Sequence, residues 1–108
     1  MFNVTARPTF RREVKINTPE GDGFKQESLT ATYRLLKGEE IDTHDLNTAK
    51  GTTGFVCAAL VRLEGVTDDT GEIPYTDVLR DQVLEWPHVR VAIANAYFDE
   101  VGKARAGN

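Results

Sequence analysis

The sequence predicts an α+β fold: an N-terminal antiparallel β-hairpin or small three-stranded sheet packed against three to four α-helices. Three observations support this prediction. Apolar and polar residues alternate through the first third of the chain, turn-forming residues interrupt this alternation, and apolar residues recur at helical spacing after residue 54. With 108 residues, of which 40 % are hydrophobic, the chain is predicted to form a single domain, residues 1–108, with one core.

The strands are predicted at about residues 2–36. Apolar residues alternate from Phe2 to Ala6, and Pro8 then either splits one strand or separates two. Alternation resumes after Pro8, and a second alternating run begins at Leu29. The apolar positions of these two runs are Phe10, Val14, Ile16, Leu29, Ala31, Tyr33 and Leu35. Because residues 18–23 between the runs are rich in turn formers, we expect an antiparallel hairpin whose apolar face needs a cover.

Helices are predicted at about residues 40–101. Residues 37–50 are mostly polar and predict only a short, exposed helix. From Phe55 to Leu63, apolar residues follow one helical stripe, which Thr52 or Thr53 could cap. The continuous apolar run 55–61 is equally typical of a buried strand, so periodicity leaves the two alternatives open. We favour a helix because Ala58, Ala59 and Arg62 suit one.

Two further helices are expected after a loop at residues 65–74. Thr76 is the predicted N-cap of the first, and Pro87 ends it and begins the second. Their apolar faces comprise Leu79, Val83 and Trp86 in the first helix, and Val89, Ile93, Ala96 and Tyr97 in the second. Gly102 is the expected helix stop, which leaves a basic, frayed tail at residues 102–108.

Composition excludes several classes of function. The formal net charge of −4 argues against binding to nucleic acid through its phosphates. The longest apolar run falls far short of the ~20 residues that span a bilayer, and the N-terminus lacks a signal-peptide pattern. We therefore expect no membrane association and a location in the cytoplasm. The single cysteine, Cys57, cannot form an internal disulfide, and its apolar surroundings predict a buried, unreactive thiol.

No catalytic signature is recognisable in the sequence. The Gly-containing stretches lack the pattern of a phosphate-binding loop and are interpreted as turns. His44 lies near Asp42 and Asp45, but no second strong ligand stands at helical spacing, so we expect no metal site. We therefore expect no catalytic residue, no cofactor and no enzymatic activity; an enzyme or small-molecule sensor built on His44 is the weakest alternative.

Three segments carry a resemblance to a known family. These are the predicted strand and acidic helix start at residues 29–42, the apolar segment and Gly-Val-Thr-Asp-Asp-Thr-Gly turn within residues 55–76, and the Trp-Pro-His-Val-Arg junction within residues 78–98. Together they resemble the small tail assembly chaperones of long-tailed bacteriophages, of the kind found in HK97-like phages and prophages. The likeness spans about residues 24–101 and rests on residue classes, not on catalytic motifs.

The resemblance implies a non-catalytic binding role. Such chaperones coat the long, apolar, helical tape-measure protein and keep it soluble until tail tube subunits polymerise around it. It implies a location in the bacterial host cytoplasm and absence from the mature virion. It also allows a frameshifted longer form that contacts the tail tube protein, and a homo-oligomer. The alternative is a structural protein of the tail or head–tail joint that is incorporated into the virion.

The apolar helical faces are the predicted partner-binding surface. We expect part of this surface to meet the client or a second subunit, because helix-in-groove recognition uses such faces. The alternative is that most of these residues only fill the core. The residues assigned to the surface are Phe55, Leu60, Leu79, Val83, Ile93 and Tyr97.

Overall fold

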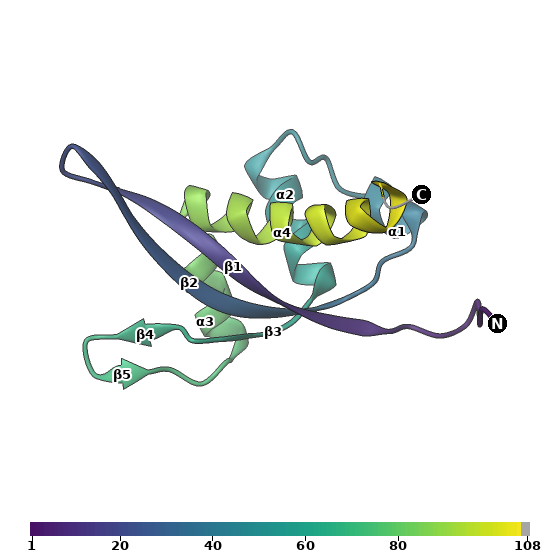
Figure 1. The fold of residues 1–108 in the computed structure, drawn as a ribbon, viewed down its shortest axis with the longest axis horizontal. Helices are drawn as coiled ribbons and strands as arrows, with labels where there is room; N and C mark the ends of the chain where they lie inside the picture. Colours follow the sequence, from purple (N-terminus) through teal and green to yellow (C-terminus); the bar gives the residue numbers. More distant parts are fainter. Residues whose placement is uncertain (107–108) are drawn as a thin grey trace.

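A computed structural model describes residues 1–106 and confirms the α+β class (Figure 1). A three-stranded antiparallel sheet, ordered β1-β2-β3, is joined by a separate two-stranded β4–β5 hairpin and four helices. The elements are β1 (Thr9–Glu20), β2 (Gly23–Arg34), α1 (Gly38–Asp42), α2 (Ala49–Ala59), β3 (Leu60–Glu64), β4 (Thr67–Asp68), β5 (Gly71–Glu72), α3 (Asp77–Leu84) and α4 (Pro87–Ala106).

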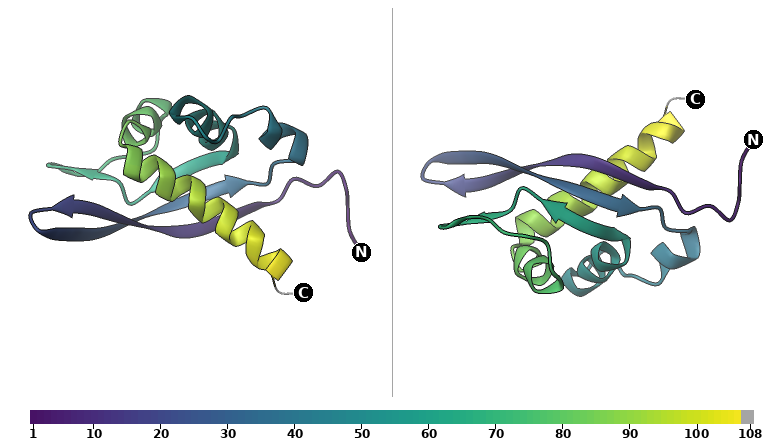
Figure 2. Two further views of the ribbon diagram at one scale, coloured as in Figure 1. Left: turned by 90° about the horizontal axis from the view of Figure 1, so that it is seen from above. Right: turned by 90° about the horizontal axis from the view of Figure 1, so that it is seen from below.

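The predicted N-terminal hairpin is formed by β1 and β2, which pair along their whole length from Thr9↔Arg34 to Glu20↔Gly23. Gly21 has a φ of +58°, a left-handed conformation that glycine adopts readily in such a tight turn. The third strand, β3, pairs only with residues 30–33 of β2. The outer part of the hairpin, residues 14–29, therefore projects beyond the three-stranded sheet as a two-stranded ribbon (Figures 1 and 2).

The interpretation of Phe55–Leu63 as one helix was wrong in its second half. Helix α2 ends at Ala59, and Leu60 takes an extended conformation (φ −80°, ψ 128°) that begins β3. Pairing with β2 supplies the backbone hydrogen bonds that a longer helix would have made internally. The helix also begins earlier than expected: Thr48, not Thr52 or Thr53, is the N-cap, and its hydroxyl accepts a 2.9 Å hydrogen bond from the Gly51 amide.

Both ends of the predicted pattern also need correction. Residues 2–6 form no strand, because no neighbouring strand pairs with them, and Phe2 and Val4 are 88 % and 75 % exposed. Gly102 does not stop the last helix, since α4 continues to Ala106 and Gly102 does not adopt a left-handed backbone. Residues 107–108 of the predicted tail lie outside the described part of the chain.

The short polar helix and the two C-terminal helices occur as predicted. The Thr76 hydroxyl caps α3 by accepting a 3.1 Å hydrogen bond from the Leu79 amide, and Pro87 is the first residue of α4. The expected loop at residues 65–74 contains the small β4–β5 hairpin, whose strands pair Thr67 with Glu72 and Asp68 with Gly71. Within residues 1–106, no helix is long and apolar enough to cross a lipid bilayer.

The core lies between one face of the sheet and the helices, with α4 crossing the sheet diagonally (Figure 2). The opposite sheet face is polar and includes the exposed side chains of Arg11, Glu13 and Lys15. Apolar side chains of β1, β2, β3, α2, α3 and α4 meet in this core: Val14, Ile16, Leu29, Ala31, Tyr33, Phe55, Val56, Ala59, Leu60, Leu63, Leu79, Val83, Leu84, Ile93, Ala94 and Tyr97.

An aromatic cluster ties the sheet to α2 and α4. Tyr97 lies at its centre, with ring centroids 5.6 Å from Phe10, 5.6 Å from Tyr33 and 5.1 Å from Phe55. Two tyrosine hydroxyls of this cluster form hydrogen bonds with backbone groups. The Tyr33 hydroxyl donates to the Ile93 carbonyl at 2.7 Å, and the Tyr97 hydroxyl accepts from the Leu36 amide at 3.0 Å. The cluster thus fixes α4 across the sheet without leaving these polar groups unsatisfied.

Candidate functional site

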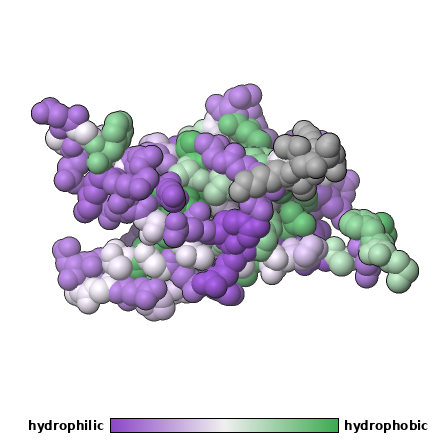
Figure 3. All heavy atoms as spheres, viewed as in Figure 1, coloured by the Kyte–Doolittle hydropathy of each residue, from purple (hydrophilic) through white to green (hydrophobic). Residues whose placement is uncertain are grey.

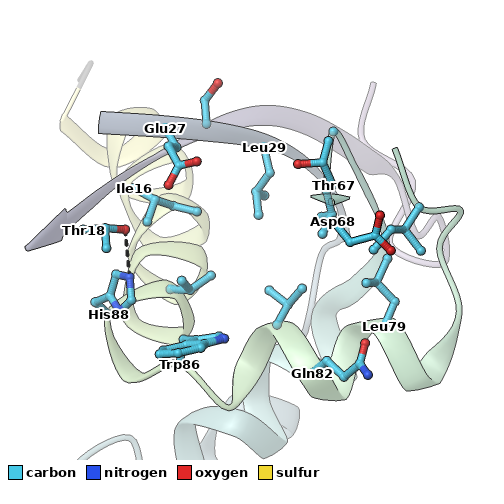
Figure 4. A pocket seen from close by; sticks show the side chains of 16 residues that line it. Ile16, Thr18, Glu27, Leu29, Thr67, Asp68, Leu79, Gln82, Trp86 and His88 are labelled. Carbon is cyan, nitrogen blue, oxygen red and sulfur yellow. Dashed lines mark hydrogen bonds between the residues drawn. The ribbon is translucent and has the colours of Figure 1, made fainter. Parts of the chain in front are cut away.

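A groove of about 480 Å³ lies where the outer ribbon separates from the helices (Figure 4). One wall is the ribbon, the other includes β4, and the floor is formed by α3 and the first turn of α4. In Figure 3 the ribbon and the β4–β5 hairpin project from the same side of the molecule with a hollow between them. The groove exists because β3 ends at Glu64 and the chain then diverges from β2.

Half of the residues that line the groove have apolar side chains. Ile16 and Leu29 reach it from the ribbon, because they lie on the sheet face that continues into the core. Leu79 and Val83 reach it from α3, where a spacing of four residues places them on one helical face. Val66, Ile73 and Val89 complete the apolar lining and are only partly buried. The groove is therefore an open continuation of the hydrophobic core.

Trp86 stands at the rim, between the end of α3 and the start of α4. Its side chain is 63 % exposed, although the sequence pattern placed it on the apolar face of a helix. Its carbonyl oxygen accepts hydrogen bonds from the amides of Val89 and Arg90 and so opens the first turn of α4. A large exposed aromatic beside an apolar groove is typical of the residues that anchor protein partners.

His88 closes one end of the groove. Its Nε2 lies 3.0 Å from Oγ1 of Thr18, so it links the start of α4 to the ribbon (Figure 4). Its ring also stands edge-on to that of Trp86, with centroids 6.3 Å apart. These contacts give His88 a bridging role between the ribbon and the rim.

The charged residues that line the groove are acidic. Glu27 lies on the ribbon and Asp68 on β4, and no Lys or Arg belongs to the lining among the described residues. Hydrogen bonds from the Thr70 hydroxyl and amide hold the pKa of Asp68 below its usual range, so this carboxylate stays ionised at neutral pH. The adjoining β4–β5 hairpin adds Asp69 and Glu72 and contains no basic residue.

The six residues predicted to bind a partner divide into two groups. Leu79 and Val83 border the groove. Phe55, Leu60, Ile93 and Tyr97 do not line the groove and are at most 4 % exposed. Leu79 and Val83 are also buried, at 4 % and 9 % exposed, so partner binding by these six residues stays a prediction. The sequence pattern placed Trp86 on a helical apolar face and did not predict its position at the rim of the groove, because helical spacing does not show which side chains are covered.

His44 and Cys57, the other residues considered in the sequence, do not line the groove. His44 is half-buried near Gly54, and no group of three or more His, Cys, Asp or Glu residues within residues 1–106 could hold a metal ion. Cys57 is half-buried, and desolvation raises the pKa of its thiol, so a smaller fraction of it is thiolate at neutral pH.

We compared the chain with protein-family models, with curated proteins and with solved structures, and none of them matched it.

Proposed function

We propose that this protein is a non-catalytic tail assembly chaperone of a long-tailed phage or prophage, acting in the bacterial host cytoplasm. Its client is the apolar, helical tape-measure protein, which it keeps soluble until the tail tube forms. The resemblance of residues 24–101 to such chaperones suggests the client. The groove between the ribbon, β4, α3 and α4 supplies a surface suited to it.

The observation that carries the proposal is the combination of an open apolar groove with an exposed Trp86 at its rim. Apolar surface that gathers in one place on a globular protein is typical of sites that bind a partner. Helix-in-groove recognition needs an apolar trough that receives side chains spaced three or four residues apart along the bound helix. The volume of about 480 Å³ accommodates several such side chains while the client helix itself stays outside.

Co-expression with the tape-measure protein of the same genome tests the proposal. We expect the wild-type chain to raise the soluble fraction of that protein. A Trp86→Ala variant should bind about 30-fold more weakly, because truncating a tryptophan that acts as an interface hot spot costs about 2 kcal/mol. Since Trp86 is mostly exposed, this variant should keep the stability of the wild type.

Phe2→Ala is the matched control, because Phe2 is also an exposed aromatic but does not line the groove. It should leave the soluble fraction of the client unchanged. No gain in client solubility with the wild-type chain would refute the proposal. Detection of the protein in purified virions would instead favour a structural component of the tail or head–tail joint.

A further inference from the structure

We infer that the groove selects apolar helical segments bordered by Lys or Arg residues. This inference rests on the groove being the client site proposed above, and it adds the charge of the client segment. The occupant is an amphipathic helix whose apolar stripe enters the groove and whose basic side chains meet the acidic walls and Trp86.

The charges across the groove favour a basic partner. Glu27 and Asp68 stand on opposite walls, so a helix lying in the groove would pass between two carboxylates (Figure 4). Nζ of Lys25 lies 3.8 Å from Oε2 of Glu27. Because both side chains are exposed, this ion pair only partly offsets the negative charge of Glu27. Asp68 has no basic neighbour in its own hairpin, where the other charged residues, Asp69 and Glu72, are also acidic. Apolar walls beside these carboxylates strengthen their field inside the groove.

Trp86, at the rim of the same groove, also favours a basic partner. An exposed indole face attracts a Lys or Arg side chain placed within about 6 Å of it, and Trp is the best aromatic partner for such contacts. The described residues place no cation against this ring: the one cation–aromatic contact in that part of the chain joins Arg12 to Phe10. Trp86 therefore favours the same kind of partner as the carboxylates, through a different interaction.

Peptide titrations test this inference directly. Trp86 is the only tryptophan of the chain, so its fluorescence reports occupancy of the rim. The probes are two helical peptides without Trp that share one Leu/Ala stripe and differ only in the flanking residues, which are Lys in one and Glu in the other. We expect the Lys peptide to bind about tenfold more tightly, with a preference that shrinks at about 0.5 M salt.

Two double variants assign the preference to the groove. Glu27→Gln with Asp68→Asn should reduce it to about threefold or less, and the Asn oxygen can still accept the hydrogen bonds from Thr70. The matched control, Glu13→Gln with Asp99→Asn, removes the same charge elsewhere and should keep the preference. Glu13 lies on the opposite sheet face, and Asp99 lies about 15 Å along α4 from Val89.

The possible outcomes separate this inference from the proposed function. Equal binding of the two peptides, or a preference that survives loss of both groove carboxylates, overturns charge selection and leaves client binding standing. Failure of either peptide to alter Trp86 fluorescence also overturns the inference if co-expression still raises client solubility. If client solubility fails to rise as well, both the inference and the proposed function are refuted.

Discussion

Replacing Gly51 by alanine should destabilise the protein strongly, although alanine normally stabilises a helix. Gly51 lies in the first turn of α2, directly beneath the backbone that leads into the helix. A Cβ atom there would lie 1.8 Å from the Asp45 carbonyl oxygen and 2.5 Å from its carbonyl carbon. Because the obstacle is backbone, rotating a side chain cannot relieve the clash.

The size of this destabilisation follows from the contacts of Asp45, whose backbone must shift to admit the added Cβ atom. Shifting Asp45 disturbs the hydrogen bonds that its carbonyl accepts from the Thr48 amide (3.1 Å) and hydroxyl (2.9 Å). It also disturbs the cap that Thr48 provides to Gly51, and losing such a cap costs about 1 kcal/mol. Overpacking adds about 1–3 kcal/mol, and alanine returns less than about 1 kcal/mol through helix propensity. We expect a net loss of about 2 kcal/mol, or about 10 °C in melting temperature.

Thermal unfolding followed by circular dichroism measures this effect against a matched control. Gly102 is also a helical glycine, but a Cβ atom there meets nothing within 4 Å. Gly102→Ala should therefore raise the stability by about 0.5–1 kcal/mol. A Gly51→Ala protein that melts at or above the wild-type temperature would refute the close approach of α2 to Asp45.

Three further predictions concern single side chains. Tyr33→Phe removes the donor to the Ile93 carbonyl and should cost about 1 kcal/mol in urea unfolding; an unchanged midpoint would contradict this. Hydrogen bonds from the Lys37 amide and from Arg7 lower the pKa of Glu40 in the folded protein. The ionised Glu40 therefore stabilises the fold fully above the usual carboxyl pKa, and this stabilisation is lost as the pH falls through the pKa of Glu40 in the folded state. Glu40→Gln should lose less stability on acidification than the wild type. Burial raises the pKa of Cys57, so a thiol reagent at pH 8 should modify the folded chain more slowly than the urea-unfolded chain; equal rates would contradict this.

Local patterns predicted the elements whose signals are local. Alternation around a turn-rich stretch predicted the β1–β2 hairpin, and Thr76 and Pro87 marked the starts of α3 and α4. The same alternation at Phe2–Ala6 predicted a strand that does not form, because a strand also needs a partner. The run 55–61 fits both a helix and a strand, and pairing with β2 decides where one becomes the other.

The groove could not have been predicted in the same way. Its lining comes from β1, β2, β4, α3 and α4, and helical periodicity identifies an apolar face without saying which part of it is covered. Leu79 and Ile93 both stand on such faces and both are buried, at 4 % and 0 % exposed, yet only Leu79 lines the groove. The groove lies where the β1–β2 hairpin extends beyond the three-stranded part of the sheet, an arrangement that no local pattern in the sequence reveals (Figure 2).

The length of the ribbon has a consequence for its motions. The same two strands pass from the buried pair Val14↔Leu29 to the exposed pair Asn17↔Gln26, so a single hydrogen-bonded ladder spans two environments. Local opening costs little free energy where few apolar contacts hold a segment. Backbone amides near the tip should therefore exchange with deuterium faster than those of the three-stranded part. The tip adjoins the ribbon residues that line the groove, so a helix bound in the groove should slow exchange along that wall.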